Sequence, residues 1–424
     1  MRLAVIFESS PFDRKGLFNA VHNRVKYLLA TGECIIDVFC VHSRDNAFTR
    51  RVRHTPEVPS VDETVVDGIR YRLLWYRFSI LDNVLLEKLH VRPWLFRRFM
   101  ESHVDLLKGY DAVIAHSFCG GLFALAAHER FGVPYYVTWH GSDVHTHPWR
   151  VPVILEDTRA VMESARCNFF VSRALLDASE RITSNARKEV LYNGVSEDFV
   201  KYSPEDRAAV RERYGLAPED KVVAFVGNIV KVKNVLSLPE IFAQVAKGYD
   251  GPLKFWIIGD GKLRKPLEAT MDLSFRPNEV SGEISFFGNQ PSPAMPDIMN
   301  CIDVLVLPSL NEGLPLVCAE ALSCGAAVVG SDVGGIAEVI GKDNVVPLVG
   351  PNDTDTFPGF PSGPLICTGQ EMGNSGRPYD DSFVNGMTEK VVAALTGQSP
   401  FQTLPADISW ARTAALELSI LKSL

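Results

Sequence analysis

Residues 303–340 read DVLVLPSLNEGLPLVCAEALSCGAAVVGSDVGGIAEVI. An apolar run at 304–307 stops at Pro308-Ser309, and a polar loop separates it from an apolar helical pattern beginning near Leu316. A short, wholly apolar run bounded by turn residues is typical of a parallel strand that is buried on both faces. We therefore predict a strand, a loop and then a helix that begins near Leu316.

The loop in this segment carries Glu312, and Glu320 lies about two helical turns beyond it. The first amides of a helix have no intrahelical partner and lie at the positive end of the helix dipole, so they suit a diphosphate. A carboxylate accepts hydrogen bonds from two vicinal hydroxyls, as in ribose or a hexose. The alternative is that both glutamates are charges on a helix surface, and the Gly334-Gly335 pair downstream disfavours it.

The same order of strand and helix runs through both halves of the chain. In the first half we expect strands at 3–7, 35–41, 112–115, 135–138 and 168–171. After a polar segment at 196–220, a second series follows at 222–226, 255–258, 284–287, 304–307 and 326–329. Apolar strands that alternate with helices indicate an α/β fold with parallel, doubly wound sheets. Ligands of such sheets bind beyond the carboxyl ends of the strands.

Composition excludes several classes of protein. The 424 residues are 46% hydrophobic and 22% charged, as expected for a globular protein, and the net charge of −8 argues against a nucleic-acid binder. We see neither a signal peptide nor an apolar stretch of the ~20 residues that a membrane-spanning helix needs. The eight cysteines form no C-x-x-C pair, which predicts buried, reduced thiols and a cytoplasmic protein.

Segment 303–340 resembles the E-x7-E signature of the retaining glycosyltransferases of family four, which share the GT-B fold. Further matches to that family follow one another along the chain: WHGSD at 139–143, Ser172, VLYNGV at 190–195, FVGNIVKVKN at 225–234, IIGDG at 257–261 and FFG at 286–288. The resemblance therefore extends over nearly the whole chain.

The resemblance implies a GT-B architecture, in which two Rossmann-like domains face each other across a cleft. Residues 1–200 would form the acceptor-binding domain, and residues 201–400 the domain that binds the sugar nucleotide. Residues 401–424 would form a helix that packs back toward the first domain. The substrates would be a nucleoside-diphosphate sugar and a glycan or lipid-linked acceptor, with no cofactor and no metal ion.

Roles in the family carry over by position. Glu312 would contact hydroxyls of the donor sugar, Glu320 those of the ribose, and Lys233 would neutralise the pyrophosphate, whose charge grows as the glycosidic bond breaks. The resemblance implies that the catalytic residues are His140, Glu312 and Lys233. The implied donor-binding residues are Gly16, Gly227, Asn228, Lys233, Gly259, Glu312, Gly313, Leu314, Leu316, Val317 and Glu320. The implied acceptor-binding residues are Asp143, Arg14 and Lys15, of which the last two are also candidate phosphate ligands.

One position departs from the family pattern, because Asn228 stands where an arginine usually accompanies the lysine. A neutral amide lacks the cationic fork of arginine. Three explanations remain open: Lys231 or a basic group of the first domain compensates, the diphosphate binds more weakly, or the donor differs.

Several other features allow more than one interpretation. The group His140, Asp143, His145 and His147 is also compatible with a metal site, although no partner motif accompanies it. Asp353-Thr354-Asp355 reads as a solvated turn rather than a metal motif, within a Pro- and Gly-rich loop expected at 351–386. Residues 88–100, KLHVRPWLFRRFM, form either a helix on an anionic membrane or one that packs its aromatic side chains inward.

The expected function is transfer of a hexose or N-acetylhexosamine with retention of configuration, in the biosynthesis of cell-surface polysaccharide such as lipopolysaccharide. With no enzyme nucleophile in view, we expect same-face attack by the acceptor hydroxyl, whose proton passes to the leaving phosphate. The protein would act in the cytoplasm or at the inner face of the membrane. The alternatives are a sugar-nucleotide epimerase or hydrolase on the same fold, and an inactive sugar-nucleotide binder.

Overall fold

The computed structural model describes residues 1–12, 16–44, 57–77, 80–275, 282–348, 379–400 and 402–423. Contacts between residues divide the chain into two compact units. Unit 1 contains Met1–Asn193 and the C-terminal segment Trp410–Leu424, and unit 2 contains most of the chain between them.

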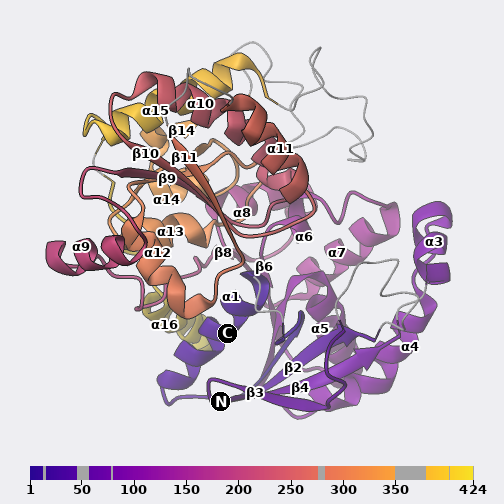
Figure 1. The fold of residues 1–424 in the computed structure, drawn as a ribbon. Coiled ribbons are helices and arrows are strands. Elements are labelled where there is room, and N and C mark those ends of the chain that lie inside the picture. The colour runs from indigo at the N-terminus through magenta and orange to yellow at the C-terminus, as the bar shows by residue number, and fades with distance from the viewer. Residues whose placement is uncertain are drawn as a thin grey trace. The chain divides into compact units, whose positions relative to one another are not determined.

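The sheet of unit 1 has the strand order β3-β4-β2-β1-β5-β6-β7-β8 within the described residues, and all of its neighbouring pairs are parallel except β3 with β4. Its strands are β1 (Arg2–Glu8), β2 (Ile35–Ser43), β3 (Glu63–Val66), β4 (Ile69–Tyr76), β5 (Ala112–His116), β6 (Tyr135–Trp139), β7 (Cys167–Phe170) and β8 (Lys188–Val190). Its helices are α1 (Gly16–Ala30), α3 (Ile80–Leu89), α4 (Trp94–His103), α5 (Ser117–Phe131), α6 (Ser142–His145), α7 (Pro152–Ser164), α8 (Arg173–Ser179) and α16 (Trp410–Ser423) (Figure 1).

The core of unit 1 explains why its central strands read as unbroken apolar runs. Every residue of β5 and β6 is buried, as is the middle of β1. Helix α16 packs on α1, and a fully buried ion pair joins Arg24 Nε to Glu417 Oε2 at 2.6 Å. Thr413 Oγ1 of α16 also donates to the carbonyl of Tyr192 at 2.6 Å. The end of the chain is therefore part of the first sheet's packing.

The sheet of unit 2 has the order β11-β10-β9-β12-β13-β14 within the described residues, and its pairs are parallel. Its strands are β9 (Lys221–Val226), β10 (Leu253–Ile258), β11 (Glu283–Gly288), β12 (Val304–Leu307), β13 (Ala327–Ser331) and β14 (Val345–Val346). Its helices are α9 (Pro204–Arg213), α10 (Leu238–Gly248), α11 (Arg264–Ser274), α12 (Met295–Cys301), α13 (Leu316–Ser323), α14 (Ile336–Ile340) and α15 (Asp381–Leu395).

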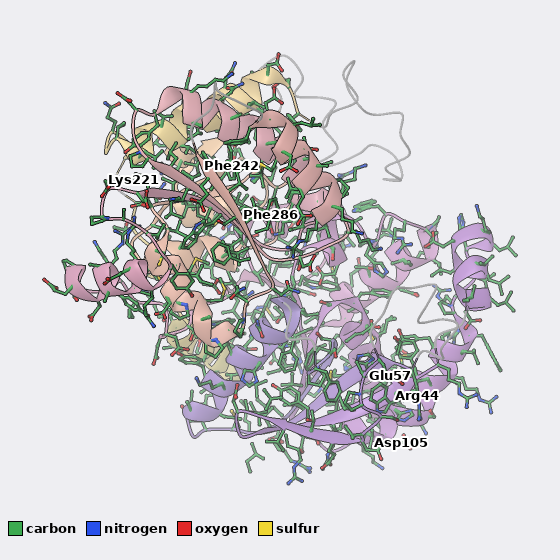
Figure 2. All side chains as sticks on the ribbon, viewed as in Figure 1. Arg44, Glu57, Asp105, Lys221, Phe242 and Phe286 are labelled. Atoms are coloured by element: carbon green, nitrogen blue, oxygen red, sulfur yellow. The ribbon has the colours of Figure 1, made fainter. Side chains whose placement is uncertain are left out.

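Aromatic side chains of unit 2 pack between a helix and the sheet and also between neighbouring strands. Phe242 of α10, labelled in Figure 2, stacks on Phe255 of β10 with 4.7 Å between ring centroids. Trp256 of the same strand packs against Phe287 of β11 at 4.8 Å. The predicted α/β class, with two mainly parallel sheets, is confirmed.

One helix was not predicted, and two local expectations need correction. The polar segment at 196–220 contains helix α9, which is stabilised by its Ser203 cap and by acidic first-turn and basic last-turn residues rather than by an apolar stripe. Helix α15 begins at Asp381, inside the predicted loop 351–386; residues 351–378, including Asp353 and Asp355, lie outside the described residues. The first sheet also has an antiparallel edge, because a turn with positive φ at Asp67 and Gly68 joins β3 to β4.

The expected single helix at 88–100 is also wrong. Helix α3 ends at Leu89 and α4 begins at Trp94. Pro93 precedes α4, where its missing N–H costs nothing, and it disfavours helical geometry in the residue before it. The segment is therefore a helix pair with a turn. No helix among the described residues is both long and apolar enough to cross a membrane.

Candidate functional site

The carboxyl end of β12 places Glu312 in contact with a lysine. Glu312 Oε1 accepts from Ser309 Oγ at 2.7 Å and lies 2.5 Å from Lys233 Nζ. The lysine side chain is 20% exposed and that of the glutamate 11%. Glu312 Oε2 has no hydrogen-bond partner among the described residues, so one carboxylate oxygen remains available to a ligand.

Lys233 is held beside this loop by the backbone. It closes a short 3-10 turn, Lys231–Lys233, that follows β9, and Asn234 then leaves the turn with φ 50°. The amide of Leu310, in the β12 loop, donates to the carbonyl of Val232 at 2.8 Å. This hydrogen bond joins the turn that carries the lysine to the loop that carries the glutamate, at the residue just before the lysine.

Gly334 explains why a glycine pair follows the glutamates. Its φ is +52°, and a Cβ at this position would lie 1.9 Å from the carbonyl oxygen of Glu312. The next amide, that of Gly335, donates to the carbonyl of Gly313 at 3.0 Å. The turn after β13 thus packs directly on the backbone that carries Glu312, with no room for a side chain.

Helix α13 begins at Leu316, as predicted. The amides of Gly313, Leu314, Leu316 and Val317 have no hydrogen-bond acceptor in the described part of the protein. They leave donors free beside the Lys233–Glu312 pair, at the positive end of the helix. This arrangement suits an anionic group such as a diphosphate.

Glu320 lies in the second turn of α13, and no hydrogen bond or ion pair joins its side chain to another described residue. Desolvation by burial raises the pKa of this carboxyl from 4.5 to about 7. An unpaired carboxylate there is costly, and a ligand hydroxyl that donates to it would offset the cost.

We expect Glu320 to make stability depend on pH. The folded protein holds this proton up to about pH 7 and the unfolded chain only up to 4.5, so the free energy of unfolding falls as pH rises across that interval. The loss reaches up to about 3 kcal/mol. Denaturant titrations of the wild type and of Glu320→Gln at several pH values should show this loss as the difference between the two proteins, because the other titrating groups, His140 among them, are common to both. Parallel pH profiles for the two proteins would contradict the shifted carboxyl.

Glycines form the neighbouring edge of the same sheet. A Cβ on Gly259 would lie 2.0 Å from the carbonyl oxygen of Gly227, and the Gly259 amide donates to Gly288 at 2.8 Å. Asn228, the departure from the family pattern, is exposed, as is Lys231. Sequence reasoning missed a cation here: Arg264, the first residue of α11, lies 3.6 Å from Asp260 and beside Gly288. Its place three residues after the G-D-G turn was the signal available.

In unit 1, His140 and Asp143 come together. Both carboxylate oxygens of Asp143 accept from the His140 amide at 3.0 Å, and one accepts from the Gly141 amide at 2.7 Å. His140 Nε2 lies 3.1 Å from Nδ1 of His116, at the end of β5. Asp143 is buried, so it shapes the loop that presents His140, and the His116 contact was not foreseen.

Burial, and secondarily the charge of Arg24, lowers the pKa of His140 from 6.5 to about 3. Below pH 6.5 the imidazole of His140 takes up a proton in the unfolded chain but not in the folded protein. The free energy of unfolding is therefore higher above pH 6.5 and decreases as the pH falls. Between pH 6.5 and about 5, we expect the free energy of unfolding to fall by about 2 kcal/mol less in His140→Asn than in the wild type. Denaturation of the two proteins at both pH values measures this, and an unchanged slope would contradict it.

The other expected residues of unit 1 are less informative. Gly16 is the exposed first residue of α1, whereas Arg14 and Lys15 lie outside the described residues. His147 packs its ring against Phe118 at 4.9 Å. Among the residues that the structure describes, no three His, Cys, Asp or Glu side chains are grouped to hold a metal ion.

Unit 1 also contains a pocket of about 200 Å³ that sequence reasoning did not find. Glu8, at the carboxyl end of β1, lines it together with Tyr76, Leu86, Phe96 and His147. The hydroxyl of Tyr76 donates to Glu8 Oε1 at 2.8 Å. The pocket therefore combines an acidic group with an apolar wall at the carboxyl edge of the first sheet.

Each of the two units matches the model of a known protein family. Residues 26–194 match the family model described as a glycosyl transferase 4-like domain, and residues 220–358 match that of glycosyl transferases group 1. The chain belongs to the family-four glycosyltransferases. The resemblance seen in the sequence is thus confirmed for the family, and the second match contains Lys233, Glu312 and Glu320.

Relatives of this glycosyltransferase include two Bacillus proteins. The chain is 29% identical over 233 residues to a B. subtilis glycosyltransferase named for teichuronic acid biosynthesis, covering 55% of this chain and 56% of that protein. It is 28% identical over 239 residues to N-acetyl-alpha-D-glucosaminyl L-malate synthase of B. anthracis, covering 56% and 59%. The matches thus span less than two thirds of either relative.

A solved structure extends the comparison to the whole chain. HepE of Anabaena, solved in complex with UDP and glucose, superposes with a TM-score of 0.62 over 99% of this glycosyltransferase and 100% of HepE, at 16% identity. At that identity the likeness concerns the fold, and it confirms the GT-B class.

Proposed function

We propose that this protein transfers a hexose or N-acetylhexosamine from a nucleoside-diphosphate sugar to a glycan or lipid-linked sugar, with retention of configuration, in cell-surface polysaccharide biosynthesis. The observation that carries the proposal is the Lys233–Glu312 pair beside the free amides at the start of α13. A cation, unpaired donors and a carboxylate with a free oxygen are the groups that a sugar-bearing diphosphate needs.

Each group has a distinct task in the proposed reaction. Lys233 and the α13 amides would contact the diphosphate, whose negative charge grows as the bond to the sugar breaks. The free oxygen of Glu312 would accept from a sugar hydroxyl, and Glu320 from the ribose. The acceptor hydroxyl would attack from the side that the diphosphate leaves, and its proton would pass to the departing phosphate.

His140 takes a limited part in this scheme. Its low pKa keeps the imidazole neutral at physiological pH, so it is not a cationic acid. A neutral ring can donate or accept one hydrogen bond at Nδ1, and its Nε2 is already directed at His116. We therefore assign it to contact with a sugar hydroxyl rather than to proton removal.

A donor screen tests the proposal. Unfolding would be followed with UDP-, GDP- and ADP-linked hexoses and N-acetylhexosamines, starting with UDP-glucose because HepE was solved with UDP and glucose. A donor at about 100 times its dissociation constant stabilises the protein by about 2.7 kcal/mol. No response to any of these donors, at concentrations far above the millimolar range, would overturn the proposal.

Retention needs its own measurement. Once a donor and acceptor pair is found, proton NMR of the early product gives the configuration at the new bond. An α-linked product from an α-linked donor is expected, and an inverted product would overturn the same-face mechanism while leaving glycosyl transfer intact.

A further inference from the structure

His116 and His140 contact each other through their rings. His116 is the last residue of β5 and is 1% exposed, whereas His140 follows the end of β6 and is partly exposed. Their ring centroids are 5.3 Å apart, and Nε2 of His140 lies 3.1 Å from Nδ1 of His116. Strands β5 and β6 are parallel neighbours, and their register places His116 opposite Thr138. The contact between the two rings is therefore set by the sheet.

The ring of His116 has little freedom to move. It packs edge to face with Phe7 of β1, with 6.4 Å between ring centroids and 77° between the ring planes. Helix α5 begins at the next residue, Ser117, whose φ of 60° is uncommon for a residue with a side chain. A Cβ on Gly120 of this helix would lie 2.4 Å from the carbonyl oxygen of Ile6, so α5 lies directly on β1. The strand, the turn and the helix start together fix the position of His116.

Neither ring is charged at physiological pH. Burial, followed by the charges of His140 and Arg24, holds the pKa of His116 well below its usual 6.5. The pKa of His140 is lowered to about 3, chiefly by burial. A neutral imidazole has one N–H and one lone pair, so the two facing nitrogens share a single proton. The two outer nitrogens, Nδ1 of His140 and Nε2 of His116, must then differ: one has a proton and the other a lone pair.

Asp143 favours one of these two arrangements. Both of its carboxylate oxygens accept from the His140 amide at 3.0 Å, and one accepts from the Gly141 amide at 2.7 Å. In any histidine, Nδ1 is one bond closer to the backbone amide than Nε2 is. A negative charge beside that amide stabilises a proton on the nearer ring nitrogen. His140 is therefore expected to have its proton on Nδ1 and its lone pair on Nε2.

We propose that His116 is a positioning residue for sugar transfer. Its Nδ1–H donates to Nε2 of His140, and this leaves Nδ1–H of His140 to donate to a hydroxyl oxygen of the transferred sugar. The contact with the sugar rests on the proposed function, whereas the tautomer is a property of the free protein. In this state the ring of His140 has no free lone pair, so it orients a sugar hydroxyl and does not remove a proton from the acceptor.

Nitrogen and carbon NMR of the full chain, with isotope-labelled histidine, tests the tautomer without any substrate. The resonances of His140 are identified by their loss in His140→Asn. At about pH 7 we expect the Nδ1–H tautomer of His140 in the wild type. In His116→Leu, which removes the donor, the Nε2–H tautomer should become populated. An Nε2–H tautomer in the wild type, or the same tautomer in both proteins, would overturn the proposal.

Three substitutions of His116 test what the contact does for the reaction. The side-chain amide nitrogen of asparagine takes the place of Nδ1, and that of glutamine takes the place of Nε2. His116→Asn should therefore keep a donor toward His140 and retain kcat within about threefold. His116→Gln and His116→Leu should lower kcat about tenfold. The KM for the donor should change little, because Lys233 and the α13 amides still bind the diphosphate. Equal kcat in all three variants would overturn the positioning role.

His128→Leu is the matched control for these variants. His128 also belongs to α5, and its Nδ1 lies 3.1 Å from the carbonyl oxygen of Val133. Its substitution should change neither kcat nor the tautomer of His140, and an equal loss of kcat there would overturn a specific role for His116. Urea denaturation of every variant shows whether a loss of kcat only follows a loss of folded protein. If the tautomers behave as expected but no donor binds, the histidine contact is retained and the proposed function fails.

Discussion

Lys233→Ala should lower sugar transfer by about a thousandfold. Among the residues that the structure describes, Lys233 is the one cation that contacts Glu312, and its loss leaves that carboxylate, 11% exposed, without its counter-charge. The negative Glu312 would then face the diphosphate directly, so both donor affinity and stabilisation of the leaving group should fall. The measurement is release of nucleoside diphosphate from the cognate donor, with and without acceptor.

Lys231→Ala is the matched control for this experiment. It lies in the same turn, is exposed, and has no ion-pair partner in the described chain. Asn228 stands where the family has an arginine. If Lys231 takes over the role of that arginine, Lys231→Ala should weaken donor binding tenfold or less. That loss corresponds to about 1 kcal/mol, as expected for a solvent-exposed contact with a phosphate. Near-normal turnover by Lys233→Ala would refute the role of Lys233.

Gly334→Ala should destabilise the protein by about 3 to 5 kcal/mol and abolish its response to donor. The added Cβ would lie 1.9 Å from the carbonyl oxygen of Glu312, so either this backbone or the turn after β13 must move. The positive φ adds strain for any residue with a side chain. Urea denaturation gives the stability, and unfolding with added donor gives the response.

Gly397→Ala separates these two effects. Gly397 has a similar positive φ of +73°, but a Cβ there meets nothing within 4 Å. Its substitution should cost only about 1 kcal/mol and leave donor binding intact. If the two alanine variants lose equal stability, backbone strain alone explains both, and the close approach to Glu312 has no consequence.

Long apolar runs in the sequence allowed the fold to be predicted. The strand at Val304–Leu307 and the helix start at Leu316 agree with the structure because a fully buried strand must be apolar throughout and a helix start has distinctive neighbours. Helix α9 and the hairpin at Asp67-Gly68 escaped notice. The first is stabilised by its caps and charges, and the second by a turn whose D-G signal was not used.

The candidate site could be predicted only in part. The loop before a helix start pointed to Glu312, but Lys233 lies 79 residues away along the chain, and only the family pattern pointed to it. His116 and Glu8 were missed because their contacts with His140 and Tyr76 depend on the order of the strands in the sheet. Sequence order does not give that information, since β1 lies between β2 and β5.

The buried pair of Arg24 and Glu417 joins residues 393 positions apart, and this has a consequence for synthesis on the ribosome. A guanidinium without its counter-ion is costly to bury, so the first sheet cannot complete its packing until the last helix has emerged. All strands of the second sheet are translated before that helix. The second sheet can therefore form while the packing of the first sheet is still incomplete. The unit translated first is therefore expected to reach its native state last.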